Sequence, residues 1–461
     1  MNALIISAIM GVAMMFSGVL LKQRSAIRGL ALAGLFIAIV LNVLEMYGFH
    51  LFKINVNNMM RFDRFALFFN TLALICTFIF FLLSAKEMEK VGLNYADYFA
   101  LIFFILCGII LASSFSSLLI LFLGIEIISI PLYILTGSDK RNLRSNEASL
   151  KYFLLGAFST GLMLMGITLI YGNSGSFTID AIAESISKPE TKPGVLLIAG
   201  LLLLMFSMAF KVSAAPFHFW TPDVYDGAPT VFTSFMATIV KAAVFIAFIR
   251  LFYHGFGNIH DTWKLIMAVI TALTLFIGNI TAVFQQSVKR MLAYSSIAQA
   301  GFMLMAILAL NSFASEGILL YTTAYSLSTI GLFAILVKMK DYTFEGFNGF
   351  AKHQPLLAAV AAIFLLSLAG IPLTAGFLAK FYMIKSVIAS GGFLWLVILA
   401  MLMAAVSVYY YFRVIQAMYF KEGEAQAMEV SGSFKWIISF VAALVILLGV
   451  YPQVLFGWFY F

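Results

Sequence analysis

Apolar residues run along this sequence in long stretches, separated by short polar segments that hold most of the charges. A helix that crosses a membrane needs about 20 predominantly apolar residues. Several connections between the stretches are only a few residues long, which favours antiparallel neighbours in a bundle. The pattern predicts an all-α polytopic membrane protein with about fourteen transmembrane helices, near residues 3–21, 29–48, 65–84, 97–112, 115–136, 148–171, 194–214, 230–253, 264–285, 291–311, 316–338, 355–385, 392–418 and 434–456.

Composition and charge agree with a membrane location. The chain has 461 residues, of which 63% are hydrophobic and 10% charged, and a soluble domain with this composition would expose very large apolar patches. Lys and Arg concentrate in the connections after odd-numbered spans, for example at Arg24, Lys90, Arg141 and Lys289, whereas the other side has few, such as Arg250. By the positive-inside rule, both termini are expected on the non-cytoplasmic side.

The chain contains a weak internal repeat. The segment "FSMAFKVSAAPF" (206–217) aligns with "LSLAGIPLTAGF" (366–377), and "LKYFLLGAFST" (150–160) aligns with "LLYTTAYSLST" (319–329). The order of these matches predicts two repeats of five helices, spans 4–8 and spans 9–13, and an odd number of crossings inverts the second repeat. The predicted organisation is an N-terminal three-helix segment, a first repeat, an inverted second repeat and a linker with a C-terminal helix, at 1–94, 95–255, 256–420 and 421–461.

Two spans are expected to be broken. Span 7 leads into Pro216, and span 12 contains Gly370, Pro372 and Gly376. Proline interrupts the hydrogen bonding of a helix, and the backbone groups that it frees must be satisfied by protein or water. In inverted-repeat transporters, such broken helices lie beside the transport site.

Four ionisable residues lie deep in the predicted spans: Glu126, Lys211, Lys241 and Lys380. A charge at the centre of a bilayer costs about 2.5–3.5 kcal/mol on insertion scales, and such residues usually mark ion or proton pathways. Burial lowers the pKa of an amine and a nearby carboxylate raises it, so buried amines linked by water can pass protons at neutral pH. Lys151 is shallower and is a lesser candidate.

Structural explanations exist for the same residues. Glu126 and Lys211 can form an ion pair that only holds helices together. His218, after Pro216, can relay protons or can pack against its aromatic neighbours. Cys76 and Cys107 lie inside apolar spans as small hydrophobic residues. Because no nucleotide-binding loop, catalytic triad or metal-ligand spacing occurs, no cofactor or metal is expected in this chain.

Three segments resemble a known family: "FKVSAAPFHFWTPDVYDGAPT" (210–230), "QQSVKRMLAYSSIAQAGF" (285–302) and "GIPLTAGFLAKFYMIKS" (370–386). They are similar to signature segments of the subunit N family, one of the antiporter-like membrane subunits of NADH-quinone oxidoreductase (respiratory complex I). The resemblance implies a fourteen-helix module that translocates protons in the bacterial inner membrane. It assigns the proton path to Glu126, Lys211, Lys241 and Lys380, with Lys151 as a lesser partner.

The resemblance also implies the surroundings of the chain. It would be one subunit of an enzyme that couples quinone reduction to proton transport, with NADH, flavin, iron–sulfur clusters and quinone bound by partner subunits. The expected partners are the other membrane and peripheral subunits and the lipid bilayer, and no nucleic acid. In span 11 the sequence offers only Tyr, Thr and Ser, so protons between Lys241 and Lys380 would need hydroxyl groups and ordered water.

Two other functions stay open at this point. The chain could belong to a multi-subunit cation/proton antiporter, which would share the broken helices and the buried lysines. It could also be a membrane scaffold that transports nothing, in which case the lysines would be structural.

Overall fold

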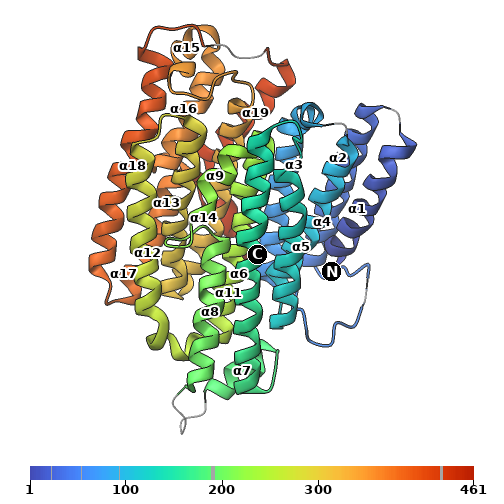
Figure 1. The fold of residues 1–461 in the computed structure, drawn as a ribbon, viewed down its shortest axis with the longest axis vertical. Coiled ribbons are helices and arrows are strands. Elements are labelled where there is room, and N and C mark those ends of the chain that lie inside the picture. The colour runs from blue at the N-terminus through green and yellow to red at the C-terminus, as the bar shows by residue number, and fades with distance from the viewer. Residues whose placement is uncertain (22, 53, 93, 188–192, 426–428, 461) are drawn as a thin grey trace. The chain divides into compact units, whose positions relative to one another are not determined.

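The computed structural model of this chain describes residues 1–21, 23–52, 54–92, 94–187, 193–425 and 429–460, and the described residues are mostly helical (Figure 1). The elements are α1(Asn2–Leu20), α2(Arg24–Met46), α3(Arg64–Val91), α4(Tyr95–Ser114), α5(Leu118–Thr136), α6(Leu143–Ser174), α7(Ile179–Ile186), α8(Val195–Lys211), α9(Trp220–Gly227), α10(Thr230–Phe235), η1(Met236–Val240), α11(Lys241–Gly255), η2(Gly257–Ile259), α12(His260–Val283), α13(Val288–Ala309), α14(Ser312–Leu336), η3(Glu345–Phe347), α15(Phe350–His353), α16(Pro355–Ala369), α17(Ala375–Ser390), α18(Leu394–Phe420), α19(Gly432–Val450) and α20(Gln453–Tyr460).

The transmembrane pattern predicted from the sequence is confirmed. Among the described residues, 12 helices are long and apolar enough to cross a membrane, and two shorter apolar helices, α8 and α16, accompany them. These two are the N-terminal parts of predicted spans 7 and 12. The fold class is therefore an all-α polytopic membrane protein.

Both predicted helix breaks are present. Helix α8 ends at Lys211, and the chain passes through Ser213, at φ 65°, before α9 begins at Trp220. Helix α16 ends at Ala369, and Gly370 (φ 84°) and Leu373 (φ 71°) precede α17. Left-handed backbone is unusual for a non-glycine residue and commonly marks a functional segment.

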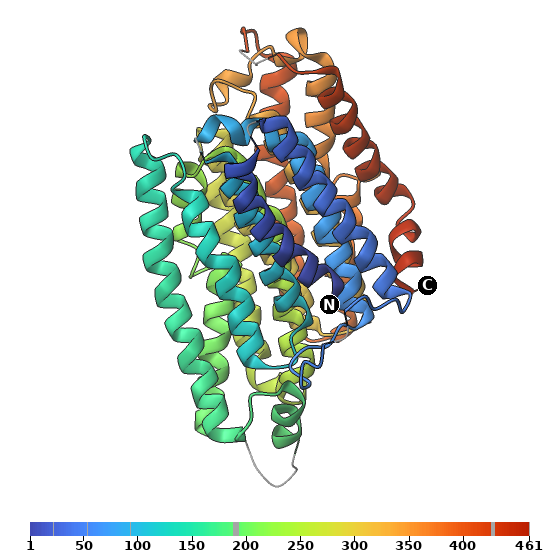
Figure 2. The same cartoon turned by 90° about the vertical axis from the view of Figure 1, so that its right-hand side faces the viewer.

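The helices form two compact units. The first unit contains Met1–Phe81, Met88–Val212 and Val240–Leu265, and the second contains Leu82–Glu87, Ser213–Ile239 and Ile266–Phe461. In the first unit, α1 packs against α2 and α4, and α4 packs along α5; Figure 2 shows α1 and α2 in dark blue. In the second unit, α14 contacts α16, α17 and α19.

The same serine contact occurs once in each unit. Ser159 of α6 and Ser207 of α8 approach at 3.0 Å between their Oγ atoms, and Ser328 of α14 and Ser367 of α16 do so at the same distance. The sequence alignment pairs these residues with one another. The contacts support the repeat, while its boundaries and the four-part division of the chain stay predictions.

Glycine pairs set the spacing of two helix pairs in the first unit. A Cβ atom on Gly108 of α4 would lie 2.7 Å from the carbonyl oxygen of Gly124 on α5, and one on Gly200 of α8 would lie 2.8 Å from that of Gly166 on α6. Small residues of this kind let transmembrane helices pack backbone to backbone. Helices α5, α6 and α8 carry the buried polar residues described below.

We expect Gly200→Ala to destabilise the protein, because the new methyl group forces α6 and α8 apart. Overpacking of this kind typically costs about 1–3 kcal/mol, and it should lower the midpoint of thermal unfolding. Gly161→Ala, on the partner helix α6, is the matched control, since a Cβ there meets nothing within 4 Å and alanine favours helix. Equal midpoints for the two variants would contradict the close helix approach.

Candidate functional site

A buried polar cluster surrounds the ammonium group of Lys211 in the first unit. Its Nζ lies 3.0 Å from Ser129 Oγ, 3.5 Å from Thr160 Oγ1 and 3.9 Å from Glu126 Oε1. The side chain of Lys211 is 6% exposed and that of Glu126 is 21% exposed. The structure thus brings together Glu126 and Lys211, two residues that the sequence predicts as partners.

Hydroxyl groups complete this cluster. Ser129 donates to the carbonyl oxygen of Ile125 at 2.7 Å, so its oxygen is available to accept from Lys211. Thr160 donates to Glu126 Oε1 at 2.6 Å while its oxygen accepts from Lys211. Thr160 therefore links the ammonium to the carboxylate by two hydrogen bonds in series, across a direct gap that is too long for a hydrogen bond.

The local sequence explains how these side chains meet. Glu126 and Ser129 are three residues apart on α5, so they lie on one face of that helix. Thr160 comes from α6, and α5 packs against α6. Lys211 is the last residue of α8, where the negative end of the helix dipole favours a cation.

Lys241 is also buried in the first unit, with 2% of its surface exposed. It is the first residue of α11 and directly follows η1, a π-helical turn at Met236–Val240. Turns of this type often mark functional sites within helices.

Lys380 lies in the second unit, on α17. Its Nζ donates to the carbonyl oxygen of Ala369 at 2.8 Å and to Ser407 Oγ at 3.3 Å, and it lies 4.8 Å from the centre of the Phe302 ring. The Ala369 carbonyl belongs to the last residue of α16, which the break leaves without an intrahelical donor. Within the described residues Lys380 forms no ion pair, and its charge is balanced by neutral dipoles and a π face.

A polar network continues beside this break. Gln299 Nε2 donates to the carbonyl oxygen of Leu368 at 2.9 Å and to the Tyr411 hydroxyl at 3.2 Å, and Tyr321 donates to Gln299 Oε1. A cavity of about 10 Å³ borders Gln299, Tyr321 and Tyr325, which is close to the smallest space that holds one water molecule. The Tyr325 hydroxyl is buried near the hydroxyl groups of Ser296 and Thr329, so polar groups continue beyond Gln299.

The two lesser candidates lie elsewhere. Lys151 pairs with Glu147 at 2.7 Å, and both side chains are well exposed, at 43% and 64%. His218 lies in the second unit, 5% exposed and stacked on Phe219, and its Nδ1 has no hydrogen-bond partner among the described residues. Among the described residues of the first unit, Lys151 is not one of the side chains that contact Lys211.

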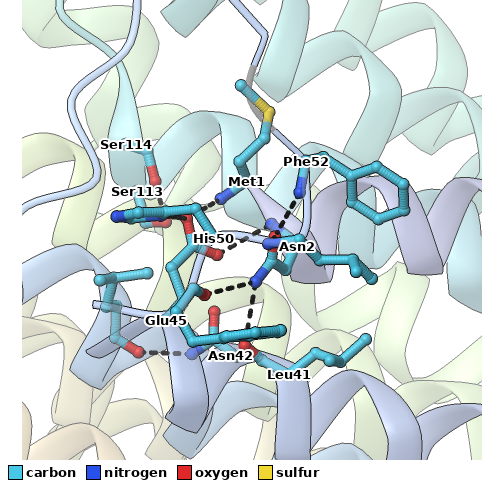
Figure 3. Close-up of polar contacts among 12 residues, drawn as sticks. Met1, Asn2, Leu41, Asn42, Glu45, His50, Phe52, Ser113 and Ser114 are labelled. Carbon is cyan, nitrogen blue, oxygen red and sulfur yellow. Dashed lines mark hydrogen bonds and ion pairs between the residues drawn. The ribbon is translucent and has the colours of Figure 1, made fainter. Parts of the chain in front are cut away.

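Sequence reasoning missed several buried polar residues. Thr160 and Ser129 carry no charge, and hydroxyl residues are common in transmembrane helices. Glu45 lies at the end of a predicted span, and its carboxylate accepts from the Met1 ammonium at 2.7 Å and the Asn2 amide at 2.8 Å (Figure 3). Its neighbour Asn42 donates to Thr71 Oγ1 at 2.8 Å.

Two cations counted as loop charges are buried. Arg250 Nη1 lies 2.7 Å from Asp63 Oδ2, and its Nε donates to the carbonyl oxygen of Phe115 at 3.1 Å. Lys289 Nζ donates to the carbonyl oxygens of Asp226 and Ala228, each at 2.8 Å, at the C-terminal end of α9. Because both residues lie near the ends of predicted spans, a count of loop charges does not show that they are buried.

Among the described residues, no group of three or more His, Cys, Asp and Glu side chains could hold a metal ion. The chemistry available here is the binding and transfer of protons by Lys and Glu side chains joined through hydroxyl groups.

Comparison with known proteins identifies the family. Residues 116–407 match the family model described as NADH:quinone oxidoreductase/Mrp antiporter, TM. The chain belongs to this family. It is 42% identical to NADH-quinone oxidoreductase subunit N of Cytophaga hutchinsonii over 400 residues, which cover 85% of this chain and 86% of that relative.

Two solved structures have the same fold as this chain. A chain of respiratory complex I from Thermus thermophilus, with bound aureothin, superposes with a TM-score of 0.84 at 31% identity, covering 98% of both chains. A chain of the Mrp complex from Dietzia sp. DQ12-45-1b superposes with a TM-score of 0.85 at 16% identity, covering 98% of this chain and 95% of that one. At such low identity the second match establishes only a shared fold.

Proposed function

We propose that this chain is a proton-translocating membrane subunit of an NADH-quinone oxidoreductase. The observation that carries the proposal is the partly buried Glu126–Thr160–Lys211 cluster at a helix break, in a chain that belongs to the NADH:quinone oxidoreductase/Mrp antiporter family. The proposed proton-transfer residues are Glu126, Lys211, Lys241 and Lys380, with Lys151 and His218 as lesser candidates.

The Glu126–Lys211 pair has the energy range that a transport switch needs. Two unit charges 4 Å apart interact by about 4 kcal/mol at an effective dielectric constant of 20. Moving one proton against 100 mV takes about 2.3 kcal/mol. Opening or closing one pair of this kind therefore changes the free energy by about as much as one transport step requires.

Thr160 gives the switch a defined geometry. With Glu126 held by the Thr160 hydroxyl, the carboxylate stabilises the protonated amine of Lys211. When Glu126 moves away, this stabilisation is lost and the buried ammonium releases its proton more easily. We infer that the proton then passes towards Lys241 in the same unit.

In the second unit, the described contacts of Lys380 include no carboxylate. The Ala369 carbonyl and Ser407 accept hydrogen bonds from its ammonium, and the nearby Tyr and Gln side chains provide hydroxyl and amide groups that water can join. We propose that Lys380 passes protons to the non-cytoplasmic side.

The driving energy must come from other subunits. Our proposal places NADH, flavin, iron–sulfur clusters and quinone in those partners, which leaves this chain the task of moving protons. The relatives named NADH-quinone oxidoreductase subunit N support this assignment.

The second candidate function is that of a subunit in a multi-subunit cation/proton antiporter. The fold match to the Mrp complex favours it, but the higher identity to subunit N relatives favours the first proposal. The purified assembly distinguishes them, because an antiporter would exchange protons for sodium without oxidising NADH.

The chain is a multi-pass membrane protein, and we propose that both of its termini face the non-cytoplasmic side. The excess of Lys and Arg in the connections after odd-numbered spans supports this orientation of the termini. The count of loop charges also includes four lysines that lie outside the described residues, Lys22, Lys53, Lys188 and Lys192.

Replacing Thr160 by valine should lower the number of protons pumped per NADH oxidised. Valine keeps the shape of threonine but removes the hydroxyl that joins Lys211 to Glu126. Loss of a hydrogen bond to a charged group costs about 1.5–3 kcal/mol, which corresponds to roughly tenfold or more in the rate of the step. Proton uptake by vesicles that contain the assembled complex measures the ratio.

Thr160→Ser keeps the hydroxyl and should retain most of the pumping. Thr168→Val is the matched control on α6, because the Thr168 hydroxyl donates to the carbonyl oxygen of Leu164 within its own helix. If both Thr160→Val and Lys211→Met pumped the normal number of protons per NADH oxidised, the cluster would have only a structural role. That result would remove the support for proton translocation.

We expect Lys380→Arg to stop pumping while the complex still assembles, because a guanidinium keeps its positive charge but does not release a proton in the working range. Lys385→Arg is the control on the same helix, where the lysine lies 3.8 Å from the Phe313 ring centre. The measurement is the proton-to-electron ratio in vesicles. Wild-type pumping by the Lys380 variant would identify Lys380 as a fixed charge.

A reporter fused to the C-terminus should be active only on the non-cytoplasmic side. Alkaline phosphatase, which folds outside the cytoplasm, should be active, and a cytoplasm-dependent fluorescent protein should be dark. The opposite pattern would overturn the proposed orientation.

A further inference from the structure

A large cleft opens in the first unit, away from the Lys211 cluster. Its volume is about 690 Å³, and it lies where α3 and α5 end and where α4 and α6 begin. This volume is within the range of small-molecule binding sites, about 300–1,000 Å³. The proposed proton transfer uses none of the side chains that line it.

Charges of both signs line the cleft without pairing. Lys140 and Arg141 contribute two cations, and Asp97 and Asp139 contribute two carboxylates. In the part of the chain that the structure describes, these four side chains form no ion pair, whereas Arg24 at the same cleft lies 3.7 Å from Glu89. A ligand that carries both a negative and a positive group would satisfy both sets.

An apolar strip leads away from these charges. Leu101 and Ile134 line the cleft, and the exposed side of α5 continues from Ile134 through Ile130 and Leu123, which are 54%, 54% and 45% exposed. Their spacing of four and seven residues places them on one helix face. In a chain that crosses a membrane, such a face contacts hydrocarbon, so the ligand is expected to have an apolar chain attached to its charged end.

We propose that this cleft binds the headgroup of phosphatidylethanolamine. The phosphate diester is bound by Lys140 and Arg141, the primary ammonium by Asp97 and Asp139, and one acyl chain lies along Ile134, Ile130 and Leu123. Phosphatidylcholine has a cation without N–H donors, and phosphatidylglycerol has no cation, so neither can donate charged hydrogen bonds to the two carboxylates. The proposal is independent of the proton-transfer function.

Photo-crosslinking in the assembled complex tests this site. The complex is placed in nanodiscs that contain equal amounts of phosphatidylethanolamine, phosphatidylcholine and phosphatidylglycerol. In each of three samples, a different one of these lipids carries a photoreactive group on its acyl chain, near the glycerol. Peptides of this chain that contain residues 134–149 are then analysed by mass spectrometry. The ethanolamine lipid should label them about tenfold more than the other two, the discrimination expected of one charge-assisted hydrogen bond.

The variants separate the two halves of the headgroup. Lys140→Ala with Arg141→Ala should lower the labelling by all three lipids, because each carries the phosphate diester. Asp97→Asn with Asp139→Asn should abolish the preference for the ethanolamine lipid over both the choline lipid and the glycerol lipid. Arg144→Ala, exposed nearby but not lining the cleft, should change nothing.

The wild-type comparison decides the proposal even if a variant fails to assemble. Equal labelling by all three lipids would mean ordinary boundary lipid, and it would overturn the proposal. An absence of labelling would overturn the proposal as well. Displacement of the lipid by inorganic phosphate would also overturn it, because it would identify the cleft as a phosphate site.

Discussion

The central constraint on this protein is that a lysine ammonium inside an apolar bundle must be solvated by protein atoms or water. At Lys211 the nearest such atoms are neutral: two hydroxyl oxygens lie closer than the carboxylate of Glu126. At Lys380 they are a carbonyl oxygen and a hydroxyl. Helix breaks make this possible, because they free backbone oxygens and end the helix beside the charge.

The two units solve this problem in different ways, and the difference fits the roles proposed for Lys211 and Lys380. Lys211 has a carboxylate within reach that is joined to it through Thr160, so a small movement of α5 or α6 changes the electrostatic environment of the amine. The contacts of Lys380 are neutral dipoles fixed by the backbone of α16 and by α18. The first arrangement suits a switch, and the second suits a site that exchanges protons with water.

The sequence predicts the spans, both helix breaks and the four deep ionisable residues, because hydropathy, proline positions and isolated charges can be read directly from the order of the amino acids. It does not predict Thr160 as the link between Glu126 and Lys211. A buried hydroxyl usually donates to a carbonyl of its own helix, as Thr136 does to Leu132, and only the packing of α6 against α5 shows that Thr160 donates across helices. The sequence also does not show that Arg250 and Lys289 are buried, since proximity to a span end does not reveal whether neighbouring helices cover a side chain.

Ion-pair geometry separates structural charges from the proposed switch. Arg250 contacts Asp63 at 2.7 Å and donates to backbone oxygens as well, and such a saturated arrangement costs several kcal/mol to break. Lys289 is held by two carbonyl oxygens at the end of α9, a position that fixes a helix end. The Glu126–Lys211 pair is longer, partly exposed and bridged by one hydroxyl, so it can open without leaving either group unsolvated. Of these charged groups, the Glu126–Lys211 pair therefore has the geometry that fits the proposed switch.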